Sequence, residues 1–286
     1  MLSLEQTAQY RRTGALVVSN VLSQGEVQEL RRVTDEFVEK SRAVTTNSDI
    51  YDLEDAHSAS APRVRRIKFP ELHHPVYSAL VRHPGIVGVL TDLMGPNIRF
   101  DVGKLNMKGA GGGDAVEWHQ DWAFYPHTND NLAAGGVMMD DMELINGPLM
   151  ILPGTHRGPI FDHHAEGQFC GAMDPGRKDV DYSQAIPLTG QAGSITVHHV
   201  RTVHGSAPNT SDKPRRLLLL QYRAADAWPL LGIQQGWDAY EKLMVAGVSS
   251  NAPRLTEVPV HLPLPAGVRG TIYEIQKSSK QRYWGR

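Results

Sequence analysis

The stretch WHQDWAFYP, residues 118–126, holds a histidine and a carboxylate two positions apart among large aromatic side chains. On a β-strand, residues i and i+2 point to the same face, so His119 and Asp121 would direct an imidazole nitrogen and a carboxylate oxygen toward one point. A second histidine from elsewhere would complete a set of two histidines and one carboxylate. Such a set leaves half of an octahedron open, which is the arrangement of non-haem Fe(II) oxygenases.

The composition is that of a globular protein. Of 286 residues, 41% are hydrophobic, and the net charge is −2. This balance gives no indication of nucleic acid or an anionic membrane surface as a partner. The single cysteine, Cys170, excludes an intrachain disulfide and fits a reducing compartment. No apolar run approaches the roughly 20 residues of a membrane span, so we expect a soluble, cytoplasmic protein.

Residues 1–96 show mainly helical patterns. Capping boxes, prolines at helix starts and glycines at helix ends predict helices after residues 3–6, over 24–41, from Pro75, and from Pro84 to Gly95. The basic stretch Arg63–Lys68 predicts a solvated edge strand, with a substrate-anion site as the alternative. We expect this region to support the rest of the fold from outside.

Glycines and prolines multiply after residue 97, and the apolar runs become short. Candidate strands are 98–107, 115–121, 135–142, 148–152, 185–188, 194–199 and 215–223. Asn146-Gly147 between two of them predicts a hairpin. Many short strands and few helices indicate a sandwich or a closed barrel. We predict one domain over residues 1–286, with a barrel core at 97–225 and a C-terminal extension at 226–286.

The best candidate for the second histidine is His204, which follows an apolar strand. The adjacent pairs His163-His164 and His198-His199 would point to opposite faces of a strand, so neither pair can hold one metal through both rings. Beyond His204, Arg215-Arg216 opens a nearly all-apolar strand. An arginine entering a buried strand needs a carboxylate partner, and one of these two should face in and the other out.

These segments, in this order, resemble the phytanoyl-CoA dioxygenase family. The matching parts are HQDWAFYP at 119–126, NGPLMILPGTH at 146–156, HGS at 204–206 and Arg215, eleven residues after His204. The resemblance covers about residues 97–225. It implies a mainly β fold of the α+β kind, a double-stranded β-helix (jelly-roll, cupin-like barrel) with N-terminal helices packed outside. It also implies an Fe(II)- and 2-oxoglutarate-dependent oxygenase that uses O2.

The resemblance also implies roles for individual residues. His119, Asp121 and His204 would hold the iron, and Arg215 would bind the distal carboxylate of 2-oxoglutarate, with Arg216 as the rival for that role. Further residues expected to touch the cosubstrate are Ser206, Lys104 and Asn106. Related halogenases lack the carboxylate ligand, so Asp121 favours hydroxylation over halogenation.

Substrate contacts are harder to predict from sequence. Phe124 and Tyr125 are candidates for a substrate wall, and so are His163 and Phe169 in the segment 161–173. That segment lacks a pattern of its own secondary structure and is therefore a candidate lid. The substrate is expected to be a small molecule, and a homo-oligomer is one option for assembly.

Two further interpretations remain open. The same iron site could carry out desaturation, epoxidation or ring formation, because these outcomes diverge only after hydrogen abstraction. In a different class, the fold could be a jelly-roll module that binds a metal and a ligand without redox turnover. The family accepts several kinds of small molecule, and the sequence does not identify which one applies.

Overall fold

The computed structural model describes residues 1–233, 235–267, 270–279 and 281–285. Its larger sheet has the strand order β1-β11-β6-β13-β4-β3-β2, with β14 paired to β4. The bounds in that order are β1 Ala15–Val18, β11 Ile195–His199, β6 Leu132–Met138, β13 Arg215–Ala224, β4 Ile98–Lys108, β3 Val64–Lys68, β2 Tyr51–Leu53 and β14 Met244–Ala246.

A smaller sheet has the order β10-β7-β12-β5. Its strands are β10 Ile186–Pro187, β7 Met150–Ile151, β12 His204–Ser206 and β5 Val116–His119. Every strand pair in both sheets is antiparallel. Residues of both sheets line one internal cavity, so the sheets enclose it between them.

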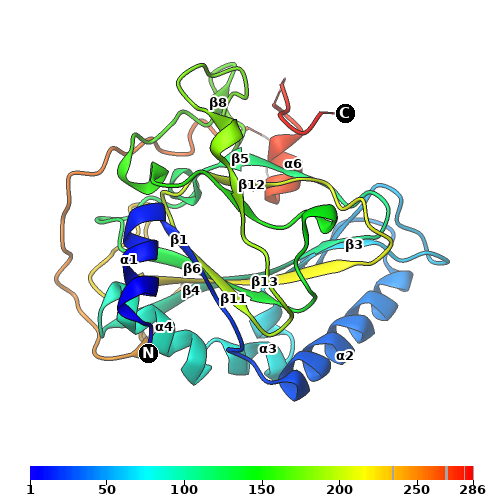
Figure 1. The fold of residues 1–286 in the computed structure, drawn as a ribbon, viewed down its shortest axis with the longest axis horizontal. Coiled ribbons are helices and arrows are strands. Elements are labelled where there is room, and N and C mark those ends of the chain that lie inside the picture. Colours follow the sequence, from blue (N-terminus) through cyan, green and yellow to red (C-terminus); the bar gives the residue numbers. More distant parts are fainter. Residues whose placement is uncertain (234, 268–269, 280, 286) are drawn as a thin grey trace.

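Helices from the N-terminal region cover the outer face of the larger sheet. The bounds of all the helices are α1 Leu4–Thr13, α2 Gln24–Lys40, α3 Pro75–Leu80, α4 Pro84–Met94, α5 Trp237–Glu241 and α6 Ile272–Gln276. Both predicted capping boxes form, at Ser3 and Ser23. Figure 1 shows α2, α3 and α4 along one side of the larger sheet, whereas α6 lies on the other side, beside β5 and β12.

Alternation along the central strands separates core from cavity. On β4, Leu105 belongs to the main hydrophobic core, whereas Lys104 and Asn106 line the cavity. On β13, Leu218 faces the core and Leu217 faces the cavity. This is the period of two expected for a strand, and burial of both faces explains why β13 is apolar almost throughout.

The N-terminal region contributes strands as well as helices. β1 pairs with β11 at one end of the larger sheet, and β3 pairs with both β2 and β4 near the other end. The prediction of a solvated edge strand at residues 63–68 is therefore wrong. Arg65 and Arg66 are buried, because β2 covers the outer edge of β3 and the cavity receives the side chain of Arg66.

The predicted hairpin at Asn146-Gly147 is also wrong. The 3-10 helix η4, Leu144–Asn146, precedes Gly147, and the chain then crosses from β6 in the larger sheet to β7 in the smaller one. Gly147 has φ +69°, and a Cβ there would lie 2.3 Å from the carbonyl oxygen of Ala207. Glycine is needed for this close approach, not for a two-residue hairpin.

Candidate metal and cosubstrate site

Pairing of β5 with β12 brings the two predicted histidines together. His204 is the direct register partner of His119, and their ring centroids lie 4.1 Å apart. β5 ends at His119, and Asp121 is the first residue of the 3-10 helix η3, Asp121–Ala123. The predicted strand over 115–121 is thus too long at its end. A tight turn, not strand alternation, carries the carboxylate to the histidines.

Backbone carbonyls fix the orientation of both rings. The Nδ1 of His119 lies 2.7 Å from the carbonyl oxygen of Glu117, and the Nδ1 of His204 lies 2.9 Å from that of Thr202. A carbonyl can only accept, so each Nδ1 carries the proton and donates it. Each Nε2 then keeps its lone pair for a metal, which is the usual arrangement for histidine ligands.

Asp121 completes a compact cluster with the two histidines. One ligand atom from each of the three residues lies within 4.8 Å of the other two. Asp121 Oδ1 is 3.8 Å from His119 Nε2 and 4.0 Å from His204 Nε2. All three side chains are buried. Two neutral imidazoles and one carboxylate on one side of a point suit Fe(II) with open positions opposite.

The surroundings of Asp121 fix its charge and orientation. Lys104 Nζ is 3.9 Å from Oδ1, whereas His198 Nε2 and Gln221 Nε2 are each 3.4 Å from Oδ2. Burial alone would raise the pKa of Asp121, but Lys104 and the histidines outweigh it and hold the pKa well below its usual range. The carboxylate is therefore ionised, as a metal ligand must be.

Burial lowers the pKa of both histidines, whereas its effect on a carboxylate is to raise the pKa. It lowers the pKa of His119 to about 4, although Asp121 partly opposes the shift. Burial, together with His119 and His198, also lowers the pKa of His204 well below its usual value. Both imidazoles are thus neutral near pH 7, and no proton competes with a metal for Nε2.

Arg215 lines the same cavity, and no carboxylate in the described part of the chain pairs with it. Its side chain is buried and donates to the carbonyl of Gly147 at 2.7 Å, whereas its Nε has no partner and no ion pair forms among the described residues. Arg216 faces the other way, as alternation predicts, and forms a fork on Asp140 at 2.8 and 2.9 Å. A buried guanidinium without an acid fits a carboxylate supplied by a small molecule.

The cavity between the histidines and Arg215 brings together the predicted cosubstrate residues. Ser206, Lys104 and Asn106 all line it. Among the other lining residues, three have polar side chains to which sequence reasoning assigned another role or none: Arg66, His198 and Tyr273. Arg66 belongs to the basic stretch whose alternative interpretation was an anion site, so its sequence carried a weak signal.

The four predicted substrate residues are an aromatic pair, Phe124 and Phe169, and two hydrogen-bonded side chains, Tyr125 and His163. Phe124 packs edge-on against His119 at 5.7 Å, and Phe169 packs against Phe124 at 5.1 Å, so an aromatic column leads away from the histidines. Tyr125 lies by Asp121 and accepts a hydrogen bond from Gln221. His163 accepts one from the backbone amide of Gln120 at 2.9 Å. None of the four is among the residues that line the cavity.

The candidate lid has secondary structure of its own, contrary to the prediction. It contains a two-stranded hairpin, β8 His164–Ala165 with β9 Gln168–Phe169. Its return strand contacts the C-terminal region through a bridge between Phe169 and Ala266. The sequence missed the hairpin because each strand is only two residues long.

Comparison with known proteins gives a consistent result. The model of the phytanoyl-CoA dioxygenase family matches residues 10–217. A "Probable alpha-ketoglutarate-dependent hypophosphite dioxygenase" of Stutzerimonas stutzeri is 38% identical over 98% of this chain and 99% of its own. An L-proline trans-4-hydroxylase of Streptomyces griseoviridis is 29% identical over 79% of this chain and 88% of its own. The iron-bound crystal structure of EctD from S. alaskensis superposes with a TM-score of 0.65 at 21% identity, covering 92% of this chain and 89% of its own.

The fold is a double-stranded β-helix with N-terminal helices packed outside, as predicted, and it carries a His-Asp-His cluster. The chain belongs to the phytanoyl-CoA dioxygenase family. It is an Fe(II)- and 2-oxoglutarate-dependent dioxygenase, which uses O2 as its oxidant. None of the helices in the described part of the chain combines the length and apolar character that crossing a bilayer requires.

Proposed function

We propose that His119, Asp121 and His204 hold the catalytic Fe(II). We further propose that Arg215 binds the distal carboxylate of 2-oxoglutarate, with Ser206, Lys104 and Asn106 as additional contacts. Iron bound there supplies the activation of O2, coupled to decarboxylation of 2-oxoglutarate to succinate and CO2. One oxygen atom enters the substrate and the other enters succinate. The observation that carries the assignment is a three-ligand cluster in the same cavity as a buried arginine that pairs with no acid among the described residues.

The residues around the iron position each contribute to this chemistry. The carbonyls of Glu117 and Thr202 keep the Nε2 atoms of both histidines free. Lys104 keeps Asp121 ionised. The apolar side chains of Leu217 and Leu219 line the cavity from β13 and limit the access of water.

Charge favours a small anion as the substrate. Arg66, Lys104 and Arg215 line the cavity, whereas Asp121 is the one acidic side chain among its described lining residues. The charges of Fe(II) and the 2-oxoglutarate dianion cancel, so the described lining side chains leave a net charge of +2 in the cavity. Buried charges of one sign require compensation, and an anionic substrate would supply it.

The relative from Stutzerimonas stutzeri suggests which anion to test first. Its name refers to hypophosphite, a small phosphorus oxyanion, and its similarity extends over nearly the whole of both chains. We therefore propose a small oxyanion, with the P–H bond of hypophosphite as the first candidate for hydroxylation. A C–H bond of a small anionic metabolite is the second candidate.

The test is succinate release by the iron-loaded protein with 2-oxoglutarate and one of three probes: hypophosphite, small carboxylates, or neutral amines and alcohols. We expect stimulation by an anion and none by the neutral compounds. Succinate release that responds only to neutral compounds would reject the anionic substrate. A protein that binds metal but not 2-oxoglutarate would reject the oxygenase mechanism and favour a non-redox binding module.

Product analysis separates the other oxidative outcomes. Hydroxylation adds one oxygen atom to the substrate, whereas desaturation and ring formation remove two hydrogen atoms without adding oxygen, and the two differ in mass. Epoxidation adds oxygen only to an alkene.

The cellular location is a separate prediction. The single cysteine, Cys170, is free and buried, and a reducing compartment such as the cytoplasm remains our prediction.

A further inference from the structure

The short C-terminal helix α6 forms part of the cavity wall. Ile272 and Tyr273, its first two residues, line the cavity together with the proposed iron ligands. The helix lies outside residues 10–217, the part of the chain that matches the family model. The predicted barrel core, residues 97–225, also excludes it. A segment distant in sequence therefore completes the site.

Polar anchors hold α6 against the barrel. Thr271, its N-cap, donates a hydrogen bond to the buried Asp52. At the other end, Gln276 Oε1 accepts from the amide of Glu117 at 3.0 Å, and Gln276 Nε2 donates to the carbonyl of Gly171 at 2.8 Å. Glu117 is also the residue whose carbonyl orients His119. The helix is thus fixed to the strand that carries an iron ligand.

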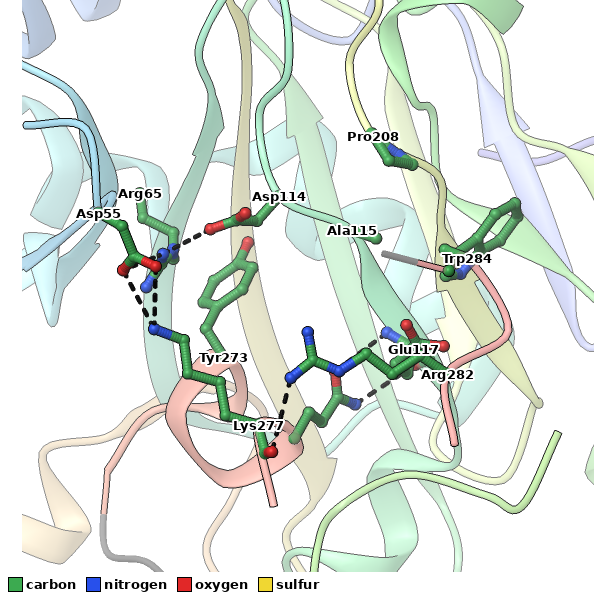
Figure 2. Close-up of a pocket in the computed structure, with 12 residues that line it drawn as sticks. Asp55, Arg65, Asp114, Ala115, Glu117, Pro208, Tyr273, Lys277, Arg282 and Trp284 are labelled. Carbon is green, nitrogen blue, oxygen red and sulfur yellow. Dashed lines mark hydrogen bonds and ion pairs between the residues drawn. The ribbon is translucent and has the colours of Figure 1, made fainter. Parts of the chain in front are cut away.

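Tyr273 is held between arginines. Its ring centroid lies 5.2 Å from the guanidinium carbons of both Arg65 and Arg66, and its side chain is 5% exposed. Figure 2 draws a second pocket that Tyr273 also lines, and it shows the phenol rising from α6 beside Arg65 and Asp114. Its hydroxyl is buried and makes no hydrogen bond in the described part of the chain. A buried hydroxyl without a partner is costly, which points to a ligand that satisfies it.

The charge state of the phenol suits a donor. Burial raises the pKa of Tyr273, and Arg66, Arg215 and Arg65 oppose that shift. The hydroxyl therefore keeps its proton near pH 7. Tyr273 and Arg215 line the same cavity.

We infer that the Tyr273 hydroxyl donates a hydrogen bond to the distal carboxylate of 2-oxoglutarate, beside Arg215. This inference rests on the proposed function. Tyr273 is thus a cosubstrate-binding residue that reaches the barrel from the C-terminal extension. The same carboxylate would satisfy the unpaired Nε–H of Arg215 and the unpaired phenol together.

The test is binding of two keto acids to Tyr273→Phe, measured by calorimetry without O2 and with Mn(II) in place of iron. 2-Oxoglutarate has the distal carboxylate, whereas 2-oxobutanoate lacks it. We expect Tyr273→Phe to weaken the binding of 2-oxoglutarate about ten-fold, which is typical for the loss of a hydrogen bond to a charged group. The affinity for 2-oxobutanoate should stay unchanged. Thermal stability of the ligand-free protein should not fall, because the variant removes an unpaired polar group.

The matched control is Tyr283→Phe, which removes the hydroxyl group of a tyrosine that is 40% exposed and belongs to the same C-terminal segment. It should bind both acids as the wild type does. Equal binding of 2-oxoglutarate by wild type and Tyr273→Phe would overturn the inference alone. Equal weakening of both keto acids would also overturn it, because it would indicate a structural effect on the cavity. Failure of the wild type to bind 2-oxoglutarate would instead overturn the proposed function.

Discussion

At the scale of single residues, Asp121 is the most constrained side chain in the cavity. One carboxylate oxygen faces both histidines and Lys104, and the other faces His198 and Gln221. Because each oxygen has separate partners, the carboxylate has little freedom to rotate. A ligand held in this way needs little reorganisation when a metal binds.

Replacement of Asp121 by alanine should therefore remove metal binding and turnover together. Loss of an outer-shell partner of a metal ligand typically costs 10- to 100-fold, so loss of the ligand itself should cost at least about 100-fold in iron affinity. Metal titration and succinate release measure the two effects. Full turnover in Asp121→Ala would contradict the proposed iron site.

Arg215 and Arg216 form a natural pair for a comparison, since they are adjacent and face opposite sides of β13. Arg215→Met should weaken 2-oxoglutarate binding about 10- to 100-fold, because a charge-assisted pair with the carboxylate is lost. Arg216→Met removes a guanidinium on the opposite face, together with its fork on Asp140. It should lower stability and leave 2-oxoglutarate affinity near the wild-type value.

Calorimetric titration of both variants with 2-oxoglutarate is the measurement. If Arg216→Met loses cosubstrate binding while Arg215→Met keeps it, the two roles must be exchanged. The burial of Arg215 and the absence of an acidic partner for it among the described residues favour Arg215 as the residue that binds the cosubstrate.

At the scale of elements, the crossing from β6 to β7 controls the position of Arg215. The carbonyl of Gly147 accepts a hydrogen bond from Arg215, and the backbone of Gly147 lies against Ala207 just beyond β12. The connection thus couples the smaller sheet to the first residue of β13. A glycine at this point allows the two backbones to touch.

Gly147→Ala should therefore destabilise the protein by about 2–4 kcal/mol and also weaken 2-oxoglutarate binding. Its Cβ would lie 2.3 Å from the Ala207 carbonyl oxygen, so the backbone must move. The control is Gly232→Ala, with φ +81° and no atom within 4 Å of the added Cβ. It carries only the cost of a left-handed conformation, about 1 kcal/mol.

Urea unfolding compares the two glycine variants, and calorimetry compares their affinity for 2-oxoglutarate. Similar destabilisation by both substitutions would show that the close approach to Ala207 adds nothing to the loss of stability in Gly147→Ala. Unchanged cosubstrate affinity in Gly147→Ala would show that its carbonyl does not position Arg215.

At the scale of the whole molecule, buried neutral histidines make stability depend on pH. His127 is 2% exposed, donates from Nδ1 to the carbonyl of Tyr125, and accepts at Nε2 from Arg223 at 2.7 Å. Burial, with Arg223, lowers its pKa to about 4. The unfolded chain therefore binds a proton near pH 6.5, whereas the folded one does not until about pH 4.

The contribution of His127 to stability is fully present above pH 6.5 and is lost as the pH falls toward 4. The difference in pKa between the folded and the unfolded chain corresponds to up to about 3 kcal/mol in the free energy of unfolding for this one group. Urea unfolding at pH 7 and pH 4.5 measures the loss, and His127→Gln should reduce the pH dependence. An equal change in the free energy of unfolding between the two pH values in the wild type and in His127→Gln would show that His127 does not titrate in this range.

The sequence by itself determined the parts of the site that depend on the order of the residues and on local hydrogen bonds. The order of His119, Asp121, His204 and Arg215, through its resemblance to the phytanoyl-CoA dioxygenase family, predicted the set of ligands, and alternation predicted that Arg215 and Arg216 face opposite ways. The structure brings the ligand atoms within 4.8 Å of one another, although a turn and not alternation carries Asp121 there. Capping boxes predicted α1 and α2, because caps are local hydrogen bonds between residues three apart. Short strands in the core were predictable from apolar runs and turn residues.

Tertiary structure alone decided what surrounds those residues. Arg66 is buried because β2 and β4 flank its strand, His198 faces Asp121 across the sheets, and Tyr273 arrives from a helix far beyond the end of the barrel core in sequence. No local pattern marks such contacts, since they depend on which strands pair and where the chain returns. The chemistry of the ligands is thus local in sequence, whereas the charge and shape of the cavity are properties of the assembled fold.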